Sequence, residues 1–117
     1  MLYNIVGYVT TVIGAVANAT KLKTNSTGAG ATTDLCATVE MNAAAVDTRA
    51  EITGTFANAM VLTIDIPKLK TLVQATFPIL PIGTIEVDCA GSDGGTGRMR
   101  WSCQYVPLEV GARIYAA

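Results

Sequence analysis

Side chains able to carry out chemistry are few in this sequence, and their spacing matches no catalytic arrangement. The 117 residues include no histidine, which removes the commonest general base and the commonest zinc ligand. Glu86, Asp88 and Asp93 could bring three carboxylates to one Ca²⁺ ion, but they fit no calcium-loop spacing, and a solvated strand face explains them as well. Cys36 has no base close in sequence to activate it as a nucleophile. We therefore expect no enzyme, no metal site and no cofactor.

The cysteines indicate a reduced protein. Cys36, Cys89 and Cys103 are an odd number, which argues against a secreted disulfide framework. Reduced thiols and synthesis in a cytoplasm fit better. Cys89 and Cys103 flank a glycine-rich turn, and a hairpin centred near Thr96 would make them cross-strand neighbours. A disulfide between them is geometrically conceivable, but we expect a reduced pair.

The composition favours a single domain that works in contact with other chains. Charged residues make up 15% of the sequence and hydrophobic residues 50%, whereas an ordinary soluble domain is about 25% charged. Weakly charged surfaces built from small residues solvate poorly and pack closely. We therefore expect a homo-oligomer; the alternative is a small monomer with an alanine-rich core. The eight basic residues are scattered, so neither nucleic acid nor a membrane surface is an expected partner.

The N-terminal segment carries no charge before Lys21. A secretory signal would need a basic start, and a membrane span of about 20 apolar residues would be interrupted by Asn4 and Asn18. An extended arm or edge strand over residues 1–17 fits its β-branched content best. Such an arm would pack on its own core or add to a neighbouring subunit. The side chains expected to contact a partner are Leu2, Tyr3, Ile5 and Val6.

Alternation of apolar and polar residues predicts half-buried antiparallel strands through most of the remaining sequence. The segments concerned are 20–25, 34–41, 60–67, 83–89 and 98–106. The side chains predicted to face inward are Thr20, Leu22, Thr24, Leu35, Ala37, Val39, Met41, Leu62, Ile64, Ile66, Ile85, Val87, Cys89, Met99, Trp101, Cys103 and Tyr105. Only residues 43–51 and 68–76 could form short helical turns.

Turn residues divide these strands and set the fold class. Glycines mark a loop at 25–33 and a hairpin turn at 91–97. Six to nine short strands in one domain predict an all-β fold, a compact antiparallel β-sandwich or jelly roll over residues 18–117, or a small barrel. Trp101, the single tryptophan, is expected to anchor the core; the alternative is a place at a subunit interface.

Two long segments resemble small virion proteins of tailed bacteriophages. In the first half, Thr33 to Ala37 (Thr-Asp-Leu-Cys-Ala) follows a Gly/Thr loop, and an Ile-Thr-Gly turn follows at Ile52 to Gly54. The closing half is similar in its Gly-Thr strand, its glycine turn, a Trp-x-x-x-Tyr-x-Pro-Leu pattern and a final Ala-Ala. These features correspond here to Gly83, Thr84, Trp101, Tyr105, Pro107, Leu108, Ala116 and Ala117.

The resemblance implies a structural protein of the virion. It implies a compact β-sandwich or jelly roll on the outside of the capsid, where a decoration or cement protein binds the major capsid protein and stabilises the shell. The protein would be made in the host bacterial cytoplasm and end on the capsid surface. The shared motifs are structural, so the resemblance assigns no site residues.

Two other functions stay open at this stage. A tail, fibre or spike component would bind a host-surface glycan through exposed aromatic side chains. The candidates for that role are Tyr3, Tyr8, Trp101, Tyr105 and Tyr115. A pilus-like or membrane-anchored subunit would use its uncharged N-terminus as a donor strand or span.

Overall fold

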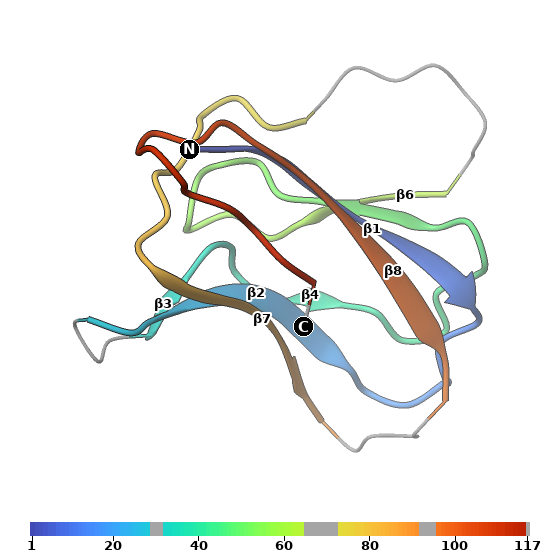
Figure 1. Ribbon diagram of the computed structural model, residues 1–117. Helices are drawn as coiled ribbons and strands as arrows, with labels where there is room; N and C mark the ends of the chain where they lie inside the picture. The colour runs from blue at the N-terminus through green and yellow to red at the C-terminus, as the bar shows by residue number, and fades with distance from the viewer. Residues whose placement is uncertain (29–31, 65–72, 92–95, 117) are drawn as a thin grey trace.

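The protein consists of β-strands joined by turns and loops. A computed structural model describes residues 1–28, 32–64, 73–91 and 96–116 (Figure 1). The strands are β1 (Leu2–Thr11), β2 (Ala19–Ser26), β3 (Thr32–Asp34), β4 (Val39–Glu40), β5 (Arg49–Glu51), β6 (Val61–Thr63), β7 (Gly83–Ala90) and β8 (Arg98–Tyr105). These ranges contain no helix, so none that could span a membrane. The all-β prediction is confirmed.

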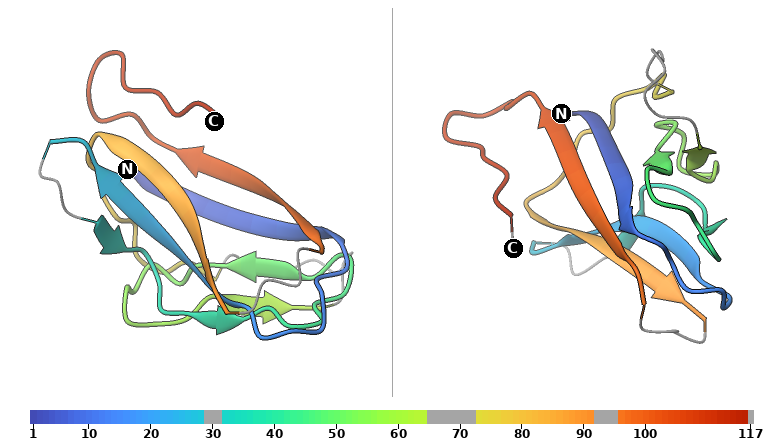
Figure 2. Two further views of the ribbon diagram at one scale, coloured as in Figure 1. Left: turned by 90° about the horizontal axis from the view of Figure 1, so that it is seen from below. Right: turned by 90° about the vertical axis from the view of Figure 1, so that its right-hand side faces the viewer.

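The strands form two antiparallel sheets in a β-sandwich-like arrangement (Figure 2). The first sheet has the order β6-β5-β1-β8. In the second sheet, β2 pairs with β7 along one edge, whereas the short strands β3 and β4 share its other edge. The long strands β1, β2, β7 and β8 therefore supply most of the scaffold, and β7 and β8 each have one neighbour among the described strands.

The core lies between the sheets, where the alternating pattern predicts it. Thr20, Leu22 and Thr24 on β2 are buried, and Lys21 and Lys23 point to the other face. The main hydrophobic cluster comprises Leu2, Ile5, Leu22, Leu35, Cys36, Ala50, Ile52 and Met60. A smaller cluster comprises Val9, Ile13 and Met41.

The N-terminal strand lies in the interior of the first sheet. β1 pairs with β5 on one side and with β8 on the other. The prediction of an arm or edge strand over residues 1–17 is therefore corrected: β1 is a central strand, and Asn4, Ile5, Val6 and Gly7, which alternate between its two faces, are all buried. Leu2, Ile5 and Val6 are buried in this chain's own core, and of the four predicted contact residues Tyr3 alone is exposed, at 42%.

The glycine-rich connection at 91–97 does not join two paired strands. β7 pairs with β2, and β8 pairs with β1, so the connection crosses from one sheet to the other. The predicted hairpin is wrong because glycines permit a sheet crossing as readily as a tight turn. Gly91 and Gly97 both have positive φ, at 137° and 107°, and their Cα hydrogens face Ala17 and Ile13 respectively.

Two other predicted strands are shorter than expected. Residues 34–41 break at 35–38 between β3 and β4, and Leu35 and Cys36 are both buried. β6 ends at Thr63, and Ile64 is 67% exposed rather than inward. The predicted inward residue Ile66 lies outside the described residues. Of the two possible helical segments, 43–51 forms turns and then β5, and 68–76 is described only from residue 73.

Candidate partner-binding surface

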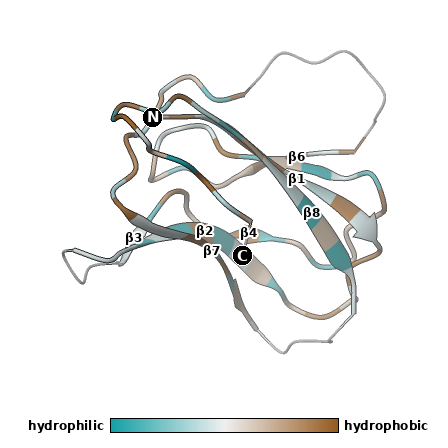
Figure 3. Cartoon of the chain, in the orientation of Figure 1, coloured by the Kyte–Doolittle hydropathy of each residue, from teal (hydrophilic) through white to brown (hydrophobic). Residues whose placement is uncertain are grey.

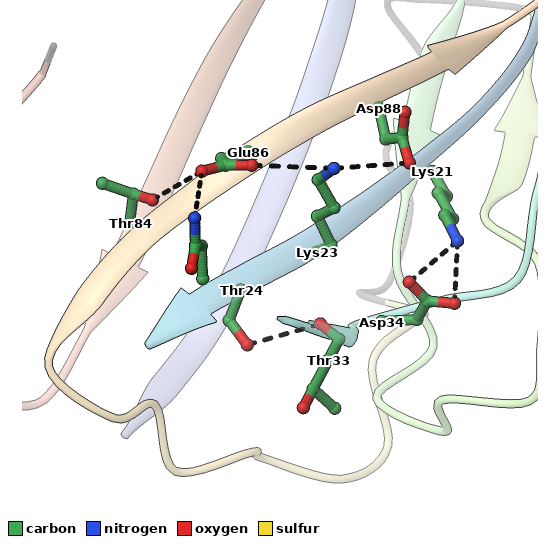
Figure 4. Close-up of polar contacts among 9 residues, drawn as sticks. Lys21, Lys23, Thr24, Thr33, Asp34, Thr84, Glu86 and Asp88 are labelled. Atoms are coloured by element: carbon green, nitrogen blue, oxygen red, sulfur yellow. Dashed lines mark hydrogen bonds and ion pairs between the residues drawn. The ribbon is translucent and has the colours of Figure 1, made fainter. Parts of the chain in front are cut away.

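Two of the carboxylates singled out in the sequence, Glu86 and Asp88, belong to a ladder of charges on the outer face of the second sheet (Figure 4). Lys23 Nζ lies 3.7 Å from Glu86 Oε2 and 3.5 Å from Asp88 Oδ2. Beside it, Lys21 Nζ lies 2.9 Å from Asp34 Oδ1. Each carboxylate thus faces a lysine rather than another acid. Among the described residues no group of three acidic or thiol side chains could hold a metal ion; Asp93 lies outside them.

Hydrogen bonds shift the pKa values of two side chains in this charge ladder. Side-chain donors on Asn25 and Thr84 hold the pKa of the Glu86 carboxyl below its ordinary value. The hydrogen bond to Asp34 raises the pKa of Lys21. Because the Glu86 pKa is lowered on folding, these contacts are intact above the ordinary pKa of a glutamate and are lost as pH falls through the lowered value. The ladder joins β2, β3 and β7, which is a structural role.

The three thiols lie in different places. Cys36 is fully buried, and the backbone N–H of Leu22 donates to its sulfur at 3.3 Å. Cys89 lies opposite Thr20 in the second sheet, whereas Cys103 lies opposite Ile5 in the first. The two are therefore not cross-strand neighbours, and all three cysteines are free. Burial raises the pKa of the Cys36 thiol and of the Cys103 thiol.

The thiols are expected to react in a fixed order. Access controls how fast a thiol reacts, so a thiol-specific reagent at neutral pH should modify exposed Cys89 first and half-buried Cys103 more slowly. Cys36 should react only after unfolding in urea. The measurement is a time course of thiol modification with peptide mapping. The Cys89→Ser variant serves as control and should lack the fast phase. If the wild type unfolded without reductant shows only one reactive thiol, that result would contradict the free state of Cys89 and Cys103.

The feature that looks most like a site is an exposed apolar surface at one side of the molecule, which we call the apolar rim. It consists of Tyr3, Phe77, Ile79, Ile82 and Val106. Ile79 is 72% exposed and Ile82 is 83% exposed, which is high for such large aliphatic side chains. Figure 3 shows the hydrophobic colouring gathered near the N-terminus and along the segment leading into β7.

Backbone hydrogen bonds hold the segments of the apolar rim together. The N–H of Leu2 donates to the carbonyl of Pro78 at 2.9 Å. Met1 and Val106 exchange two bonds, at 2.7 and 2.8 Å. At the other end of segment 77–82, the N–H of Thr27 donates to the carbonyl of Ile82, also at 2.9 Å, which fixes that end beside the end of β2. The rim is thus built on fixed backbone.

Aromatic stacking orders the middle of the rim. The rings of Tyr3 and Phe77 are nearly parallel, at 5°, with their centroids 5.1 Å apart. Each ring covers one face of the other and leaves its remaining surface to solvent, since both residues are 42% exposed. Ordered apolar groups lose little side-chain entropy on binding, so this surface suits contact with another apolar surface.

Exposed apolar side chains also occur away from the rim. Val12 and Val46 are 53% and 46% exposed, and they belong to segments joined by the bond from Ile13 N–H to the carbonyl of Ala44. They lie at the far end of β1 from Tyr3. Isolated exposed valines are normal on a protein surface, so they serve below as controls.

The sequence pointed to one residue of the rim. Tyr3 is among the predicted contact residues, whereas residues 77–82 are predicted only to connect two strands. The sequence feature that could have indicated residues 77–82 as exposed apolar surface is the run Phe-Pro-Ile-Leu-Pro-Ile. Its two prolines prevent regular strand pairing of an apolar segment. Leu80 packs against the core, and its neighbours Ile79 and Ile82 stay outside.

Comparisons with protein families, with characterised proteins and with solved structures find no match to this chain.

Proposed function

We propose that this protein is a structural virion protein that binds the outside of a bacteriophage capsid and stabilises the shell. The observation that carries the proposal is the apolar rim, because five large side chains on fixed backbone offer a ready docking surface. The low charge of the chain and its resemblance to small virion proteins favour the capsid as the partner. The rim, rather than an N-terminal arm, is the surface proposed to contact the major capsid protein.

Such a role needs adhesion and rigidity. A capsid must resist the pressure of packed DNA, and copies that bridge neighbouring shell subunits add contact area where the shell is weakest. Each contact can be modest, since symmetry repeats it over the whole particle and bivalent attachment raises the effective affinity. A β-sandwich-like scaffold with paired long strands supplies a surface that does not deform under load.

The rim predicts which substitutions weaken binding to shells. Ile79→Ser combined with Ile82→Ser removes two aliphatic side chains that make no part of the core, so the fold should persist. We expect affinity for shells stripped of this protein to fall at least about tenfold, because burying one such side chain contributes about 1.5–3 kcal/mol. The measurement is cosedimentation of the purified variant with shells.

A matched control separates loss of the rim from loss of apolar surface in general. Val12→Ser with Val46→Ser removes comparable exposed groups at the other end of β1 and should leave shell binding unchanged. Equal binding by the rim variant and the wild type, with both folded by circular dichroism, would contradict the assignment of the rim.

The stacked pair of Tyr3 and Phe77 favours a second candidate, a tail, fibre or spike component that binds a host-surface glycan. Exposed aromatic faces stack on sugar rings, and this pair is exposed and ordered. Tyr3→Ala and Phe77→Ala distinguish the two roles. A glycan-binding protein would bind sugar as wild type, lose that binding in each single variant and show no affinity for shells. A decoration protein would bind shells as wild type and show no sugar-dependent change.

A further inference from the structure

We infer that residues 108–116 of one copy add as a strand along the free edge of β8 in a second copy. The inference concerns contacts between copies of this chain and not contacts with the shell. It therefore stands independently of the proposed function, and a failure of either can be recognised without the other.

The 108–116 segment has the sequence pattern of a strand. Leu108, Val110, Ala112, Ile114 and Ala116 alternate with Glu109, Gly111, Arg113 and Tyr115. Period-two alternation of this kind is typical of a strand with one face buried. In the single chain that face is not buried, since Val110 is fully exposed, Leu108 is 57% exposed and Ile114 is 39% exposed.

In its own chain the segment belongs to neither sheet. Figure 2 shows it running apart from both sheets in two views. Among the described residues, it is held by a turn bond from Ala112 N–H to the carbonyl of Glu109 and by a bond from Ile114 N–H to the Tyr105 hydroxyl, at 3.1 and 3.2 Å. In the monomer, therefore, the apolar face of this segment is exposed and its described backbone groups make few hydrogen bonds.

β8 offers the matching edge. It is 8 residues long and pairs with β1 on one side only within the described sheets. It contains no proline, and its pairing with β1 is regular from Asn4 to Val9, so a flat row of backbone donors and acceptors is left unpaired. Its inward residues Met99, Trp101 and Cys103 are half-buried, which leaves apolar surface for a further strand to cover.

Charge complementarity identifies the occupant as this segment. A strand that runs parallel to β8 with Val110 beside Trp101 directs Glu109 to the opposite face, across from Arg100 and near Arg98, and places Arg113 across from Gln104. Neither Arg98 nor Arg100 has a carboxylate partner among the described residues. Glu109 beside these arginines supplies attraction, and the parallel direction is favoured because the antiparallel one would place Arg113 opposite Arg98.

Geometry favours a second copy over the same chain. Val106 is bound to Met1 through both its N–H and its carbonyl, so the chain stays beside β1 up to that point. Folding back onto its own β8 would then use residues 107–110 for the turn, so that Leu108, Glu109 and Val110 could not pair with that strand. Across two copies, the whole of 108–116 can lie along a strand of similar length, as strand addition requires.

The experiment measures mass in solution for the full chain and for charge variants. Wild type is expected to sediment as a dimer or a larger closed ring, and a variant that ends at Pro107 is expected to sediment as a monomer with an unchanged circular dichroism spectrum. Glu109→Arg, and separately Arg98→Glu with Arg100→Glu, should each weaken self-association at least about tenfold.

Mixing the two charge variants provides the decisive step. In the mixture, the positive charge introduced at position 109 of one chain meets the negative charges introduced at positions 98 and 100 of the other, and the reverse contact restores the wild-type pairing. Association should therefore return on mixing, which only contact between copies explains. A wild type that is monomeric at every accessible concentration, a Pro107 variant that still associates, or a mixture that stays monomeric would overturn the inference.

Discussion

Removal of residues 1–12 is expected to abolish folding. The deletion takes away all of β1, the central strand that joins β5 to β8, together with buried Leu2, Ile5 and Val9. Truncating one such side chain to alanine costs about 2–5 kcal/mol, whereas a whole domain is stable by only about 5–15 kcal/mol. Circular dichroism and NMR chemical-shift dispersion of the truncated protein should show an unfolded or aggregated chain.

A deletion of similar length at the other end is the control. Loss of residues 108–117 removes a segment whose described part, residues 108–116, is exposed and makes two hydrogen bonds, so that variant should keep a cooperative melting transition. A protein lacking residues 1–12 that melts cooperatively near the wild-type temperature would contradict the interior placement of β1 and would support the prediction of an N-terminal arm.

Gly7→Val is expected to destabilise the domain by about 3 kcal/mol, because it overpacks a tight contact in the core. Gly7 on β1 lies opposite Trp101 on β8. A Cβ atom at Gly7 would lie 2.7 Å from Trp101 Cζ3 and 2.8 Å from Met99 Cε, closer than van der Waals contact allows. The indole therefore lies over a position where only hydrogen fits. Equilibrium unfolding in urea measures the loss as a lower midpoint at an unchanged slope.

Gly28→Val is the matched control for that substitution. A Cβ atom at Gly28 meets no atom of the described residues within 4 Å apart from its chain neighbours, and this glycine has no left-handed φ. Its effect should stay within about 0.5 kcal/mol, as for most surface changes. In a Trp101→Leu background the cost of Gly7→Val should shrink, because the two sites share one contact; an equal cost in both backgrounds would show that the ring does not cause it.

The alternation of side chains predicted the strands that have one buried face. Residues 20–25 and 98–103 follow the pattern because one side of each strand packs on the core, whereas Tyr105, predicted to face inward, is 36% exposed. In β7 the pattern predicts the strand but overstates its burial: Val87 faces Leu22 across the sheet yet is 45% exposed, since β7 is an edge strand. Periodicity reports which face a residue is on, and the neighbours decide how well that face is covered.

The sequence did not predict which strands pair with one another. An uncharged segment rich in β-branched residues is compatible with an arm, an edge or a central strand, and only the positions of β5 and β8 decide among them. The Trp101 core position was predicted, but its partner Gly7 was not, because the contact joins residues far apart in sequence. The same holds for the apolar rim, whose segments meet through the backbone bonds of Leu2 and Val106 and through the stacking of Tyr3 on Phe77.

Quantitative mass spectrometry of purified virus particles that contain this chain tests the proposed capsid role most directly. Copies of the chain are counted against copies of the major shell protein. Decoration of the shell predicts hundreds of copies, in a whole-number ratio to the shell protein, as symmetry requires. A handful of copies per particle would place the chain in the tail or spike, and its absence from particles would contradict a virion role altogether.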